Sequence, residues 1–290
     1  MATALREAVR DASRVLADAG VPSPDHDARA LAEHVLGVDT LALAPEPGPG
    51  FPAAYADVVA RRAAREPLQH IVGWAAFRHL RLTVRPGVFV PRPETEHVAE
   101  VAIAELRSVE RPVAVDLCCG AGGIAISMAT ETTARVVAVD ASPAAVQLTA
   151  DNATACRARL RVQLGDVRDA LLLHDLTGEV DVLVANPPYI PPGAVPVDPE
   201  VRDHDPELAL YGGGPDGLDV PRAVAAAAAR LLRPGGLLVM EHADVQGAAA
   251  RALVEATGAF EGSRTLPDLA GRDRMVVARR VERSRGPVAP

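Results

Sequence analysis

The sequence is poor in aromatic residues and in cysteine. The low aromatic content does not prevent a core, whereas the low cysteine content excludes a disulfide-stabilised fold. Aromatic residues make up 3% of the 290 residues, but hydrophobic residues together make up 49%, which is enough for a large core and outside the range of disordered chains. The three cysteines, Cys118, Cys119 and Cys156, are too few for a disulfide-stabilised fold, and two of them are adjacent. We therefore expect a soluble protein in a reducing, cytoplasmic compartment.

Long apolar runs and a targeting signal are also lacking. No apolar run approaches the roughly 20 residues that a membrane span requires. Residues 1–17 carry both acidic and basic side chains, which a signal peptide would not, namely Arg6, Glu7, Arg10, Asp11 and Arg14. The sequence thus predicts that the protein has no membrane partner.

Positive charge is in short supply as well. The formal net charge is −8 and the pI is near 5.5, so no long-range attraction draws the chain to nucleic acid, although a local basic groove stays compatible with this balance. We expect no direct nucleic-acid partner. The cysteines show no paired C-x-x-C spacing, and we expect no metal site.

The beginning of the chain predicts a small helical domain, residues 1–66. Apolar residues recur at helical spacing from Leu5 to Leu16, and Gly20-Val21-Pro22 ends this first helix. A second helix is expected to begin after Ser23 or Asp25, either of which could cap it, and to run to Leu36. A third is expected from about Ala53 to Arg65. No catalytic group stands out in this region.

A β-hairpin linker is expected next, within residues 67–91. The runs Gln69 to Phe77 and Leu80 to Val84 are β-like, and a turn near Arg78-His79 separates them. After this linker, a proline-rich turn leads into a helix that reaches about Leu106.

From Pro112 onward, strand-like and helical runs alternate, which predicts a parallel sheet with helices on both faces. The expected helices are Ile124–Ala129, Ala144–Ala155 and Pro221–Leu232. The expected strands are Val113–Leu117, Val136–Val139, Leu160–Leu164, Val180–Ala185, Leu237–Met240, Ala259–Thr265 and Met275–Arg279. Residues 282–290 are expected to form a disordered tail.

A glycine-containing turn follows the first of these strands. The sequence Val115 to Ile124 leads from a strand through Cys118, Cys119, Gly120, Ala121 and Gly122 into a helix, so that backbone can approach a nucleotide-like ligand closely. Neither a G-x-G-x-x-G fingerprint nor a P-loop lysine is present. A tight strand–helix connection with no ligand would show a similar pattern. Together with Asp116, which precedes the turn, these residues are our first candidates for cofactor binding.

Two further carboxylates follow the next strands. Asp140 stands at the end of its strand, where it could accept hydrogen bonds from both hydroxyls of a ribose, and Ser142 is available to cap the following helix in its place. Asp166 could accept from an exocyclic amino group while Val167 packs on a purine. A helix cap and a plain turn are the alternative interpretations. The shared position at the carboxyl ends of successive strands favours the ligand site.

The most informative stretch is Asn186-Pro187-Pro188-Tyr189, directly after the apolar run Val180–Ala185. The two prolines hold the backbone extended and donate no N–H. The Asn186 side chain and the carbonyls of this stretch can accept hydrogen bonds from a planar nitrogen, and the Tyr189 ring can stack on it. Beside an adenosine-containing cofactor, such a pocket fits S-adenosylmethionine, whose methyl group needs only an aligned nitrogen.

At this point the sequence resembles the protein-(glutamine-N5) methyltransferases of the PrmC/HemK type. The resemblance rests on Arg65–Gly73, on Phe89–Glu96 (FVPRPETE) and on Asp181–Ile190 (DVLVANPPYI). N-P-P-Y alone is shared with N6-adenine methyltransferases, whereas the combination is specific. Additional family-like segments lie downstream, at Val201–Asp203, Glu207–Leu210, Asp216–Leu218 and Met240–His242.

The resemblance implies a Rossmann-like, seven-stranded class I methyltransferase domain at residues 92–281 behind the helical domain and the hairpin. It implies S-adenosylmethionine as cofactor, a class I peptide chain release factor as partner, and the glutamine of the release factor's Gly-Gly-Gln motif as acceptor. The helical domain would bind the release factor, and the enzyme is expected to be a monomer. By the resemblance, the glutamine contacts are Asn186, Pro187, Pro188 and Tyr189, with Asn186, Pro187 and Tyr189 as catalytic residues, and the cofactor contacts are Cys118 through Gly122, Asp140, Val167 and Asn186.

The sequence also departs from the family pattern. Cys118 replaces the first glycine of D-L-G-x-G-x-G, so we expect its side chain to shift the loop or to crowd the tail of the cofactor. The segment Leu210–Asp216 carries a tyrosine and an extra residue where the family has Asp-Gly-Gly. The Gly73–Phe77 hairpin and the Cys118-Cys119 pair also resemble a PrmC-related branch. An amide or amine of another protein or of a small molecule and, less favoured, a nucleic-acid adenine therefore remain alternative acceptors. His242 is also a candidate acid or base, but for this residue we favour a structural role at a strand end over catalysis.

Overall fold

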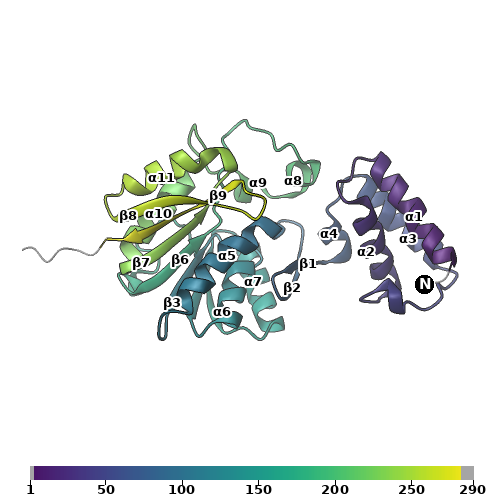
Figure 1. Cartoon of the computed structure of the whole chain (residues 1–290), viewed down its shortest axis with the longest axis horizontal. Coiled ribbons are helices and arrows are strands. Elements are labelled where there is room, and N and C mark those ends of the chain that lie inside the picture. Colours follow the sequence, from purple (N-terminus) through teal and green to yellow (C-terminus); the bar gives the residue numbers. More distant parts are fainter. Residues whose placement is uncertain (1–2, 282–290) are drawn as a thin grey trace, which may run out of the picture. The chain divides into compact units, whose positions relative to one another are not determined.

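The computed structural model describes residues 3–281, which divide into two compact units (Figure 1). The first unit contains the residues up to Trp74 together with the short segments Val84–Pro86 and Val195–Asp205. The remaining residues form the second unit. Within residues 3–281, no helix has the length and apolar character needed to cross a membrane. The predicted tail, residues 282–290, lies outside the described residues.

The first unit is helical, as its apolar spacing predicts. Its helices are α1 (Thr3–Asp18), α2 (Pro24–Leu36), η1 (Leu41–Leu43), α3 (Phe51–Ala63) and α4 (Leu68–Val72). Their apolar faces meet in one core, which includes the fully buried Leu16 and Leu31 and the nearly buried Tyr55. The Tyr55 hydroxyl donates to the Ala28 carbonyl at 2.7 Å, so the polar end of this buried ring has a partner.

A second feature of this unit is a buried ion-pair cluster. The guanidinium of Arg62 lies 2.7 Å from Asp27 and 2.8 Å from Glu200, and the Arg62 and Asp27 side chains are less than a tenth exposed. Arg65 makes two further bonds to the same Glu200 carboxylate, at 2.8 and 2.6 Å. Glu200 lies in the short helix α8 (Pro199–His204), so these ion pairs attach α8 to the helical unit.

The predicted β-hairpin is shorter than expected. Its first half, Gln69–Val72, lies in α4 instead of a strand, and only β1 (Trp74–Phe77) and β2 (Leu80–Thr83) pair. Pro67 stands at the N-cap of α4, and Gly73 ends the helix with φ 82°, a value that favours glycine. The β-branched Ile71 and Val72 suggested a strand, but the burial of Leu68 and Ile71 in the helical core overrides that propensity.

The second unit is built on a seven-stranded sheet in the order β5-β4-β3-β6-β7-β9-β8 (Figure 1). All neighbouring strands are parallel except β9, which is antiparallel to both β7 and β8. This is the predicted α/β fold, and it matches the alternation of strands and helices in the sequence. The strands are β3 (Val113–Leu117), β4 (Arg135–Asp140), β5 (Leu160–Leu164), β6 (Val180–Ala185), β7 (Leu232–Glu241), β8 (Phe260–Pro267) and β9 (Asp273–Arg280).

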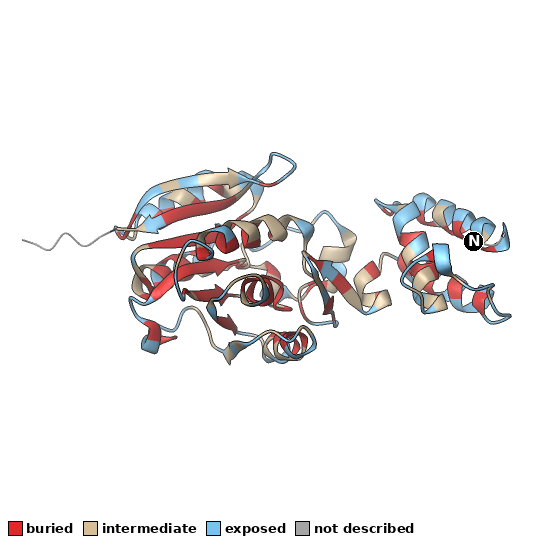
Figure 2. Cartoon of the chain, turned by 60° about the horizontal axis from the view of Figure 1, so that its bottom comes forward, coloured by how far each residue is buried: buried red, intermediate tan, exposed pale blue. Residues whose placement is uncertain are grey.

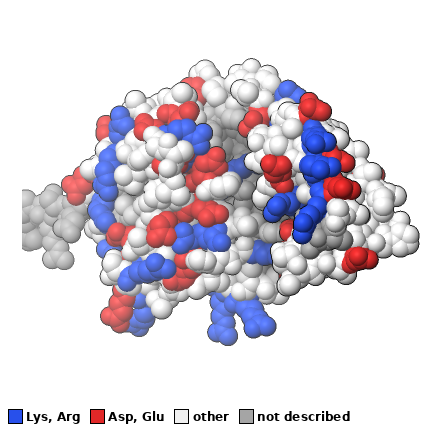
Figure 3. All heavy atoms as spheres, turned by 45° about the vertical axis from the view of Figure 1, so that its right-hand side comes forward, with Lys and Arg blue, Asp and Glu red and all other residues white. Residues whose placement is uncertain are grey.

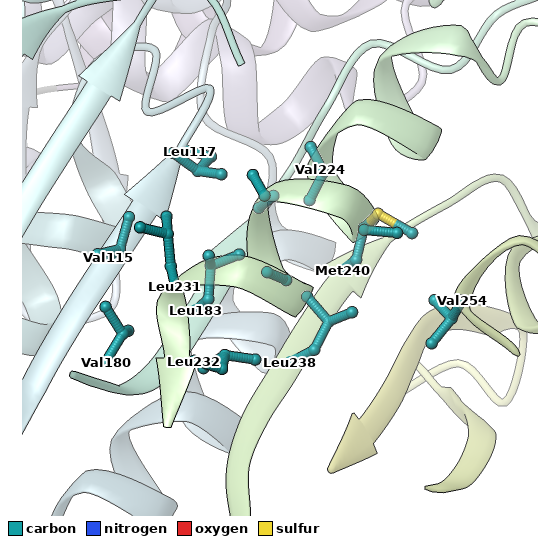
Figure 4. Packing of buried hydrophobic residues seen from close by; sticks show 14 of the residues in the cluster. Val115, Leu117, Val180, Leu183, Val224, Leu231, Leu232, Leu238, Met240 and Val254 are labelled. Atoms are coloured by element: carbon teal, nitrogen blue, oxygen red, sulfur yellow. The ribbon is translucent and has the colours of Figure 1, made fainter. Parts of the chain in front are cut away.

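Helices cover both faces of the sheet, and successive strand residues alternate between them. α11 (Gly247–Glu255) packs on β8 and β9. Val115, Leu183 and Leu238 share a core cluster with Val224 and Leu231 of α10 (Asp219–Leu231), as Figure 4 shows. Their strand neighbours, such as Ala114 and Val184, pack against α5 (Pro93–Leu106) and α6 (Gly123–Glu131). The central strands are buried on both sides, as Figure 2 shows in red.

The element predictions in this unit are mostly confirmed. β3, β5 and β6 begin and end at the predicted residues, and α7 (Pro143–Ala155) differs by one residue. α10 ends one residue earlier than expected, because Leu232 is already the first residue of β7 and pairs with Val180 of β6. The sequence interpretation missed α11 and the four-residue helix α9 (Glu207–Leu210).

Candidate active site

The topology brings the predicted polar positions to one edge of the sheet. β5, β4, β3 and β6 are consecutive in the sheet and parallel. Asp166, Asp140, Gly120 and Asn186 each follow or end one of these strands. Because parallel strands end at the same edge, these positions lie along the crevice where α/β sheets bind ligands.

The turn after β3 has an open, glycine-dependent shape. Gly120 has φ 56° and Gly122 has φ 88°, values that glycine adopts without steric penalty. A Cβ placed on Gly120 would meet no atom within 4 Å, so its outer surface is free to approach a ligand. Cys118 also adopts a left-handed backbone conformation, with φ 63°, at the position where the family pattern has glycine.

Helix α7 holds this turn from behind. The Thr149 hydroxyl donates to the Gly120 carbonyl at 2.8 Å, and the Asn152 amide donates to the Ala121 carbonyl at 2.9 Å. Thr149 also lies 3.6 Å from the Cys119 sulfur. The turn is therefore rigidly supported on the side that faces away from the crevice.

The Asp140 carboxylate is a structural part of the turn as well as a ligand candidate. Its Oδ2 accepts from the Gly120 amide at 2.9 Å and its Oδ1 from the Ser142 amide at 2.8 Å. Ser142 caps α7 through Ala145, as predicted, but it does not leave Asp140 free. Each carboxylate oxygen keeps a second acceptor position for a ribose hydroxyl. Burial raises the pKa of this carboxyl, and the backbone donors oppose that rise.

Asp116 lies beneath the turn instead of on its open surface. The side chain is fully buried, and its Oδ2 accepts from the Ala125 amide at 3.0 Å. Its Oδ1 is a buried oxygen with no hydrogen-bond partner within residues 3–281. Burial raises the pKa of this carboxyl well above its ordinary value.

Asp166 already has a cationic partner. Arg168 binds this carboxylate through its backbone amide at 2.9 Å and through Nη2 at 2.6 Å, and this hydrogen bonding lowers the pKa of Asp166. Val167 packs against the core cluster that lies under α10. A role for Asp166 in accepting from a ligand amino group thus competes with Arg168.

The two cysteines of the turn are held as neutral thiols. Burial is the main cause that raises the pKa of both Cys118 and Cys119, and the nearby Asp116 and Asp140 carboxylates add to it. Because the thiolate is the nucleophilic form of cysteine, these side chains do not offer a competing nucleophile beside a methyl donor.

The Asn186–Tyr189 stretch is fixed by contacts on several sides. The Asn186 Nδ2 donates to the Thr95 hydroxyl at 3.2 Å, and the Tyr189 carbonyl accepts from Gln246 at 2.9 Å. Gly217 passes so close that a Cβ there would lie 2.5 Å from the Tyr189 carbonyl oxygen. The unusual glycine-rich segment after Leu210 thus packs directly on the motif. Burial raises the pKa of the Tyr189 phenol, which therefore stays protonated.

The sequence interpretation did not identify Thr95 as a site residue or its contact with Glu241. Thr95 lies in the first turn of α5, and its hydroxyl donates to Glu241, at the end of β7, at 2.8 Å. Both belong to segments that carry the family resemblance, and this was the available signal. His242 is buried, and its Nδ1 donates to the Ala243 carbonyl at 2.8 Å, in keeping with the structural role favoured above. Arg92 lies over the Phe89 ring, 5.0 Å from its centroid.

In the described part of the chain, basic and acidic side chains are interspersed. On the face drawn in Figure 3, arginines lie next to acidic side chains instead of forming one continuous basic surface. Among residues 3–281, no cluster of His, Cys, Asp and Glu has the arrangement to hold a metal ion.

Comparison with known proteins now decides the family. Residues 7–73 match the model of the PrmC N-terminal domain, and residues 79–197 match the methyltransferase small domain. The chain is 49% identical to the release factor glutamine methyltransferase of Streptomyces coelicolor, over 94% of this chain and 96% of the relative. The identity to the enzyme of the same name from Mycolicibacterium smegmatis is 47%, over 97% and 100% of the two chains. The chain belongs to the release factor glutamine methyltransferase family.

Solved structures support the same fold. A 16S rRNA methyltransferase of T. thermophilus, in complex with AdoMet and guanosine, has a TM-score of 0.53 with 24% identity, over 71% of this chain and 49% of that one. A methyltransferase of Pyrococcus furiosus has a TM-score of 0.51 with 15% identity, over 71% and 92% of the chains. These likenesses show the class I methyltransferase architecture.

The cofactor of this methyltransferase is S-adenosylmethionine, and the residues at the sheet edge fit it. The open surface of Gly120 admits a ligand next to backbone. The Asp140 oxygens retain acceptor positions for hydroxyl groups.

Proposed function

We propose that this protein transfers a methyl group from S-adenosylmethionine to the side-chain nitrogen of a glutamine, namely that of the Gly-Gly-Gln motif in class I peptide chain release factors. The single observation that carries the proposal is the Asn186 carboxamide. It lies at the end of β6, next to the Gly120 turn in the sheet, with its Nδ2 bound to Thr95. Its Oδ1 is thereby turned to the other side, where an acceptor amide can bind. The names of the relatives supply the substrate.

The residues of the motif orient the acceptor nitrogen. An amide nitrogen is a weak nucleophile because its lone pair is delocalised into the carbonyl. We assign the Asn186 Oδ1 and the Pro187 carbonyl as acceptors for its two N–H groups, which fixes the nitrogen and favours the positive charge that develops on it. The Tyr189 ring, held by the Gln246 bond to its carbonyl, stacks on the amide plane. Asn186, Pro187 and Tyr189 are thus the proposed catalytic residues, and Pro188 completes the pocket.

Cofactor binding is assigned to the turn after β3 and to the two following strand ends. Cys118, Cys119, Gly120, Ala121 and Gly122 present backbone to the ligand, Asp140 accepts from the ribose, and Val167 packs on the adenine. When bound, S-adenosylmethionine supplies an electrophilic methyl group on a sulfonium sulfur. Asp116 acts from below the turn, through the hydrogen bond that its buried carboxyl accepts from the Ala125 amide. Asp166 can accept from the adenine amino group only when its own bond to Arg168 is broken.

The helical unit is assigned to recognition of the release factor. It matches the PrmC N-terminal domain, and its residues offer no catalytic constellation of their own. We further propose that the enzyme acts as a monomer in the cytoplasm and needs no direct nucleic-acid contact. On this basis we divide the chain into a recognition domain (1–66), a linker (67–91), a methyltransferase domain (92–281) and a tail (282–290).

The proposal is tested by methyl transfer from labelled S-adenosylmethionine to recombinant release factor. Label should enter the wild-type release factor and not a variant in which the glutamine of Gly-Gly-Gln is replaced by alanine. A short Gly-Gly-Gln peptide should be a much weaker substrate than the whole release factor, because it lacks the surface that the helical unit binds. Equal labelling of both release factors would place the acceptor elsewhere.

A further inference from the structure

A chain of three side chains connects the substrate pocket to the buried end of β7. Thr95 is 6% exposed and stands between Asn186 and Glu241, which is 3% exposed. The Thr95 Oγ1 lies 3.2 Å from the Asn186 Nδ2 and 2.8 Å from the Glu241 Oε2. The three residues come from the end of β6, the start of α5 and the end of β7.

The direction of these hydrogen bonds follows from the chemistry of Glu241. An ionised carboxylate can only accept, so the single proton of the Thr95 hydroxyl must point to Glu241. The Thr95 oxygen then offers only lone pairs to Asn186, and only the amino side of the carboxamide can meet them. The Asn186 Oδ1 is consequently held on the opposite side of the carboxamide.

We propose that Thr95 and Glu241 are positioning residues for methyl transfer, which orient the Asn186 carboxamide so that its oxygen faces the acceptor nitrogen. This inference rests on the proposed function of Asn186 and deepens it. The opposite orientation would direct two N–H donors at a substrate amino group that itself donates, and the acceptor would lose a hydrogen bond.

Protonation of Glu241 provides a way to reverse this orientation. Charged and titratable groups face Glu241 from three elements: Arg274 on β9 opposes protonation, whereas Glu94 on α5 favours it, and Tyr189 lies beyond β6. Burial is the largest influence and raises the pKa of Glu241 to about 7. A protonated Glu241 can donate to Thr95, whose hydroxyl then becomes free to donate to the Asn186 Oδ1. The carboxamide would turn over.

The first test compares Thr95→Val with Thr95→Ser at saturating cofactor. Valine keeps the shape but removes the hydroxyl, and we expect kcat to fall roughly 10²-fold, as for the loss of one preorganised polar group in an active site. Serine keeps the hydroxyl and should restore kcat to within a few-fold of wild type. Binding of S-adenosylmethionine, measured by calorimetry, should be unchanged in both variants and reports that they are folded.

A second readout does not depend on activity. The side-chain NH₂ signals of Asn186 in an NMR spectrum, assigned by their loss in Asn186→Ala, should shift with pH around a midpoint near 7. They should not titrate in Glu241→Gln or Thr95→Val. The neighbouring His242 is a titratable group on the same strand end, and burial lowers its pKa. A midpoint that persists in Glu241→Gln would point to His242 and overturn the proposal.

The outcomes separate this inference from the proposed function. If wild type methylates the release factor but Thr95→Val matches its kcat, or Thr95→Ser is as impaired as Thr95→Val, the positioning role is wrong and the function stands. If wild type transfers no methyl group to Gly-Gly-Gln, the proposed function fails. The NMR titration then still decides whether Glu241 orients Asn186.

Discussion

The side chains at the carboxyl ends of β4 and β6 have different proposed roles: Asp140 binds the cofactor, and Asn186 binds the acceptor. Asp140 is bound to the amides of Gly120 and Ser142, whereas Asn186 contacts Thr95 of α5. Since these residues lie on separate elements, their substitutions are expected to affect separate steps of the reaction.

Asn186→Ala should remove the acceptor for the substrate nitrogen and leave the cofactor residues in place. We expect kcat for methyl transfer to fall by at least roughly 10²-fold, the scale seen when one preorganised hydrogen-bonding group is lost from an active site. Steady-state kinetics with release factor measure kcat, and calorimetry should give a near-normal Kd for S-adenosylmethionine. A variant with near-normal turnover would remove Asn186 from its proposed role.

Asp140→Ala should show the reverse pattern. The loss of charge-assisted hydrogen bonds is expected to weaken cofactor binding by about 1–3 kcal/mol. Titration calorimetry with S-adenosylmethionine measures this change, and Asp175→Ala, an exposed carboxylate that binds Arg161, serves as a control. Equal affinities for the wild type and Asp140→Ala would contradict the assignment.

At the scale of elements, the glycine-rich segment that follows α9 supports the Asn186–Tyr189 motif. Ile190 pairs with this segment through the Leu210 carbonyl at 2.9 Å and the Gly212 amide at 3.1 Å. Gly217 has φ 75° and lies closer to the Tyr189 carbonyl than a residue with a Cβ could. The extra residue that departs from the family pattern therefore lies in an element that shapes the pocket.

Gly217→Ala should disturb the pocket at a distance from the chemistry. The new Cβ would require the Tyr189 carbonyl to shift, and displacement of a reacting group by about 1 Å can lower the rate roughly 10²-fold. Gly258→Ala is the matched control, because Gly258 also has a positive φ of 64° but no atom within 4 Å of a new Cβ. Kinetics should show a large loss of kcat for the first variant only. Equal kcat in both variants would show that this segment does not position the motif.

The individual elements also show how much of the fold the sequence could predict. β6 is buried on both faces, so its run of residues, apolar except for Asp181, was enough to give its bounds. The pairing of Thr95 with Glu241 was not predictable, because 146 residues separate them and neither local spacing nor composition indicates which strand end receives α5. Gln69–Val72 was predicted to be a strand from its local sequence. Its helical conformation depends on burial in the helical core, which the local sequence does not show.

At the scale of the whole molecule, distant segments are joined by buried charges. Glu200 and Arg65 are 135 residues apart in sequence, and no local signal in the sequence indicates their contact. The family resemblance predicted a helical domain and a methyltransferase domain, but not that α8, which follows the N-P-P-Y motif, would share a compact unit with the N-terminal helices.

Glu200 should make stability depend on pH. Hydrogen bonds from Arg65 and Arg62 outweigh burial and lower the pKa of Glu200 to about 2. A carboxyl with a lowered folded-state pKa contributes stability above its unfolded pKa of about 4.3, and this contribution is lost as the pH falls through the folded value. The free energy of unfolding should therefore exceed that of Glu200→Gln at pH 6, with the difference shrinking toward pH 2.

Urea unfolding of both proteins between pH 6 and pH 2 measures this difference. Glu261→Gln, at an exposed position of β8, is a control that should follow the wild type at every pH. A difference between wild type and Glu200→Gln that stays constant over this range would contradict the ion-pair account.

The central claim is that the Asn186 pocket methylates a glutamine side chain, and one measurement tests it most directly. Recombinant release factor is incubated with this protein and S-adenosylmethionine, and its Gly-Gly-Gln peptide is sequenced by tandem mass spectrometry. With wild-type protein we expect one added methyl group, located on the glutamine side chain, and with Asn186→Ala we expect none. An unmodified glutamine after incubation with wild-type protein that binds the cofactor, or a methyl group on another residue, would contradict it.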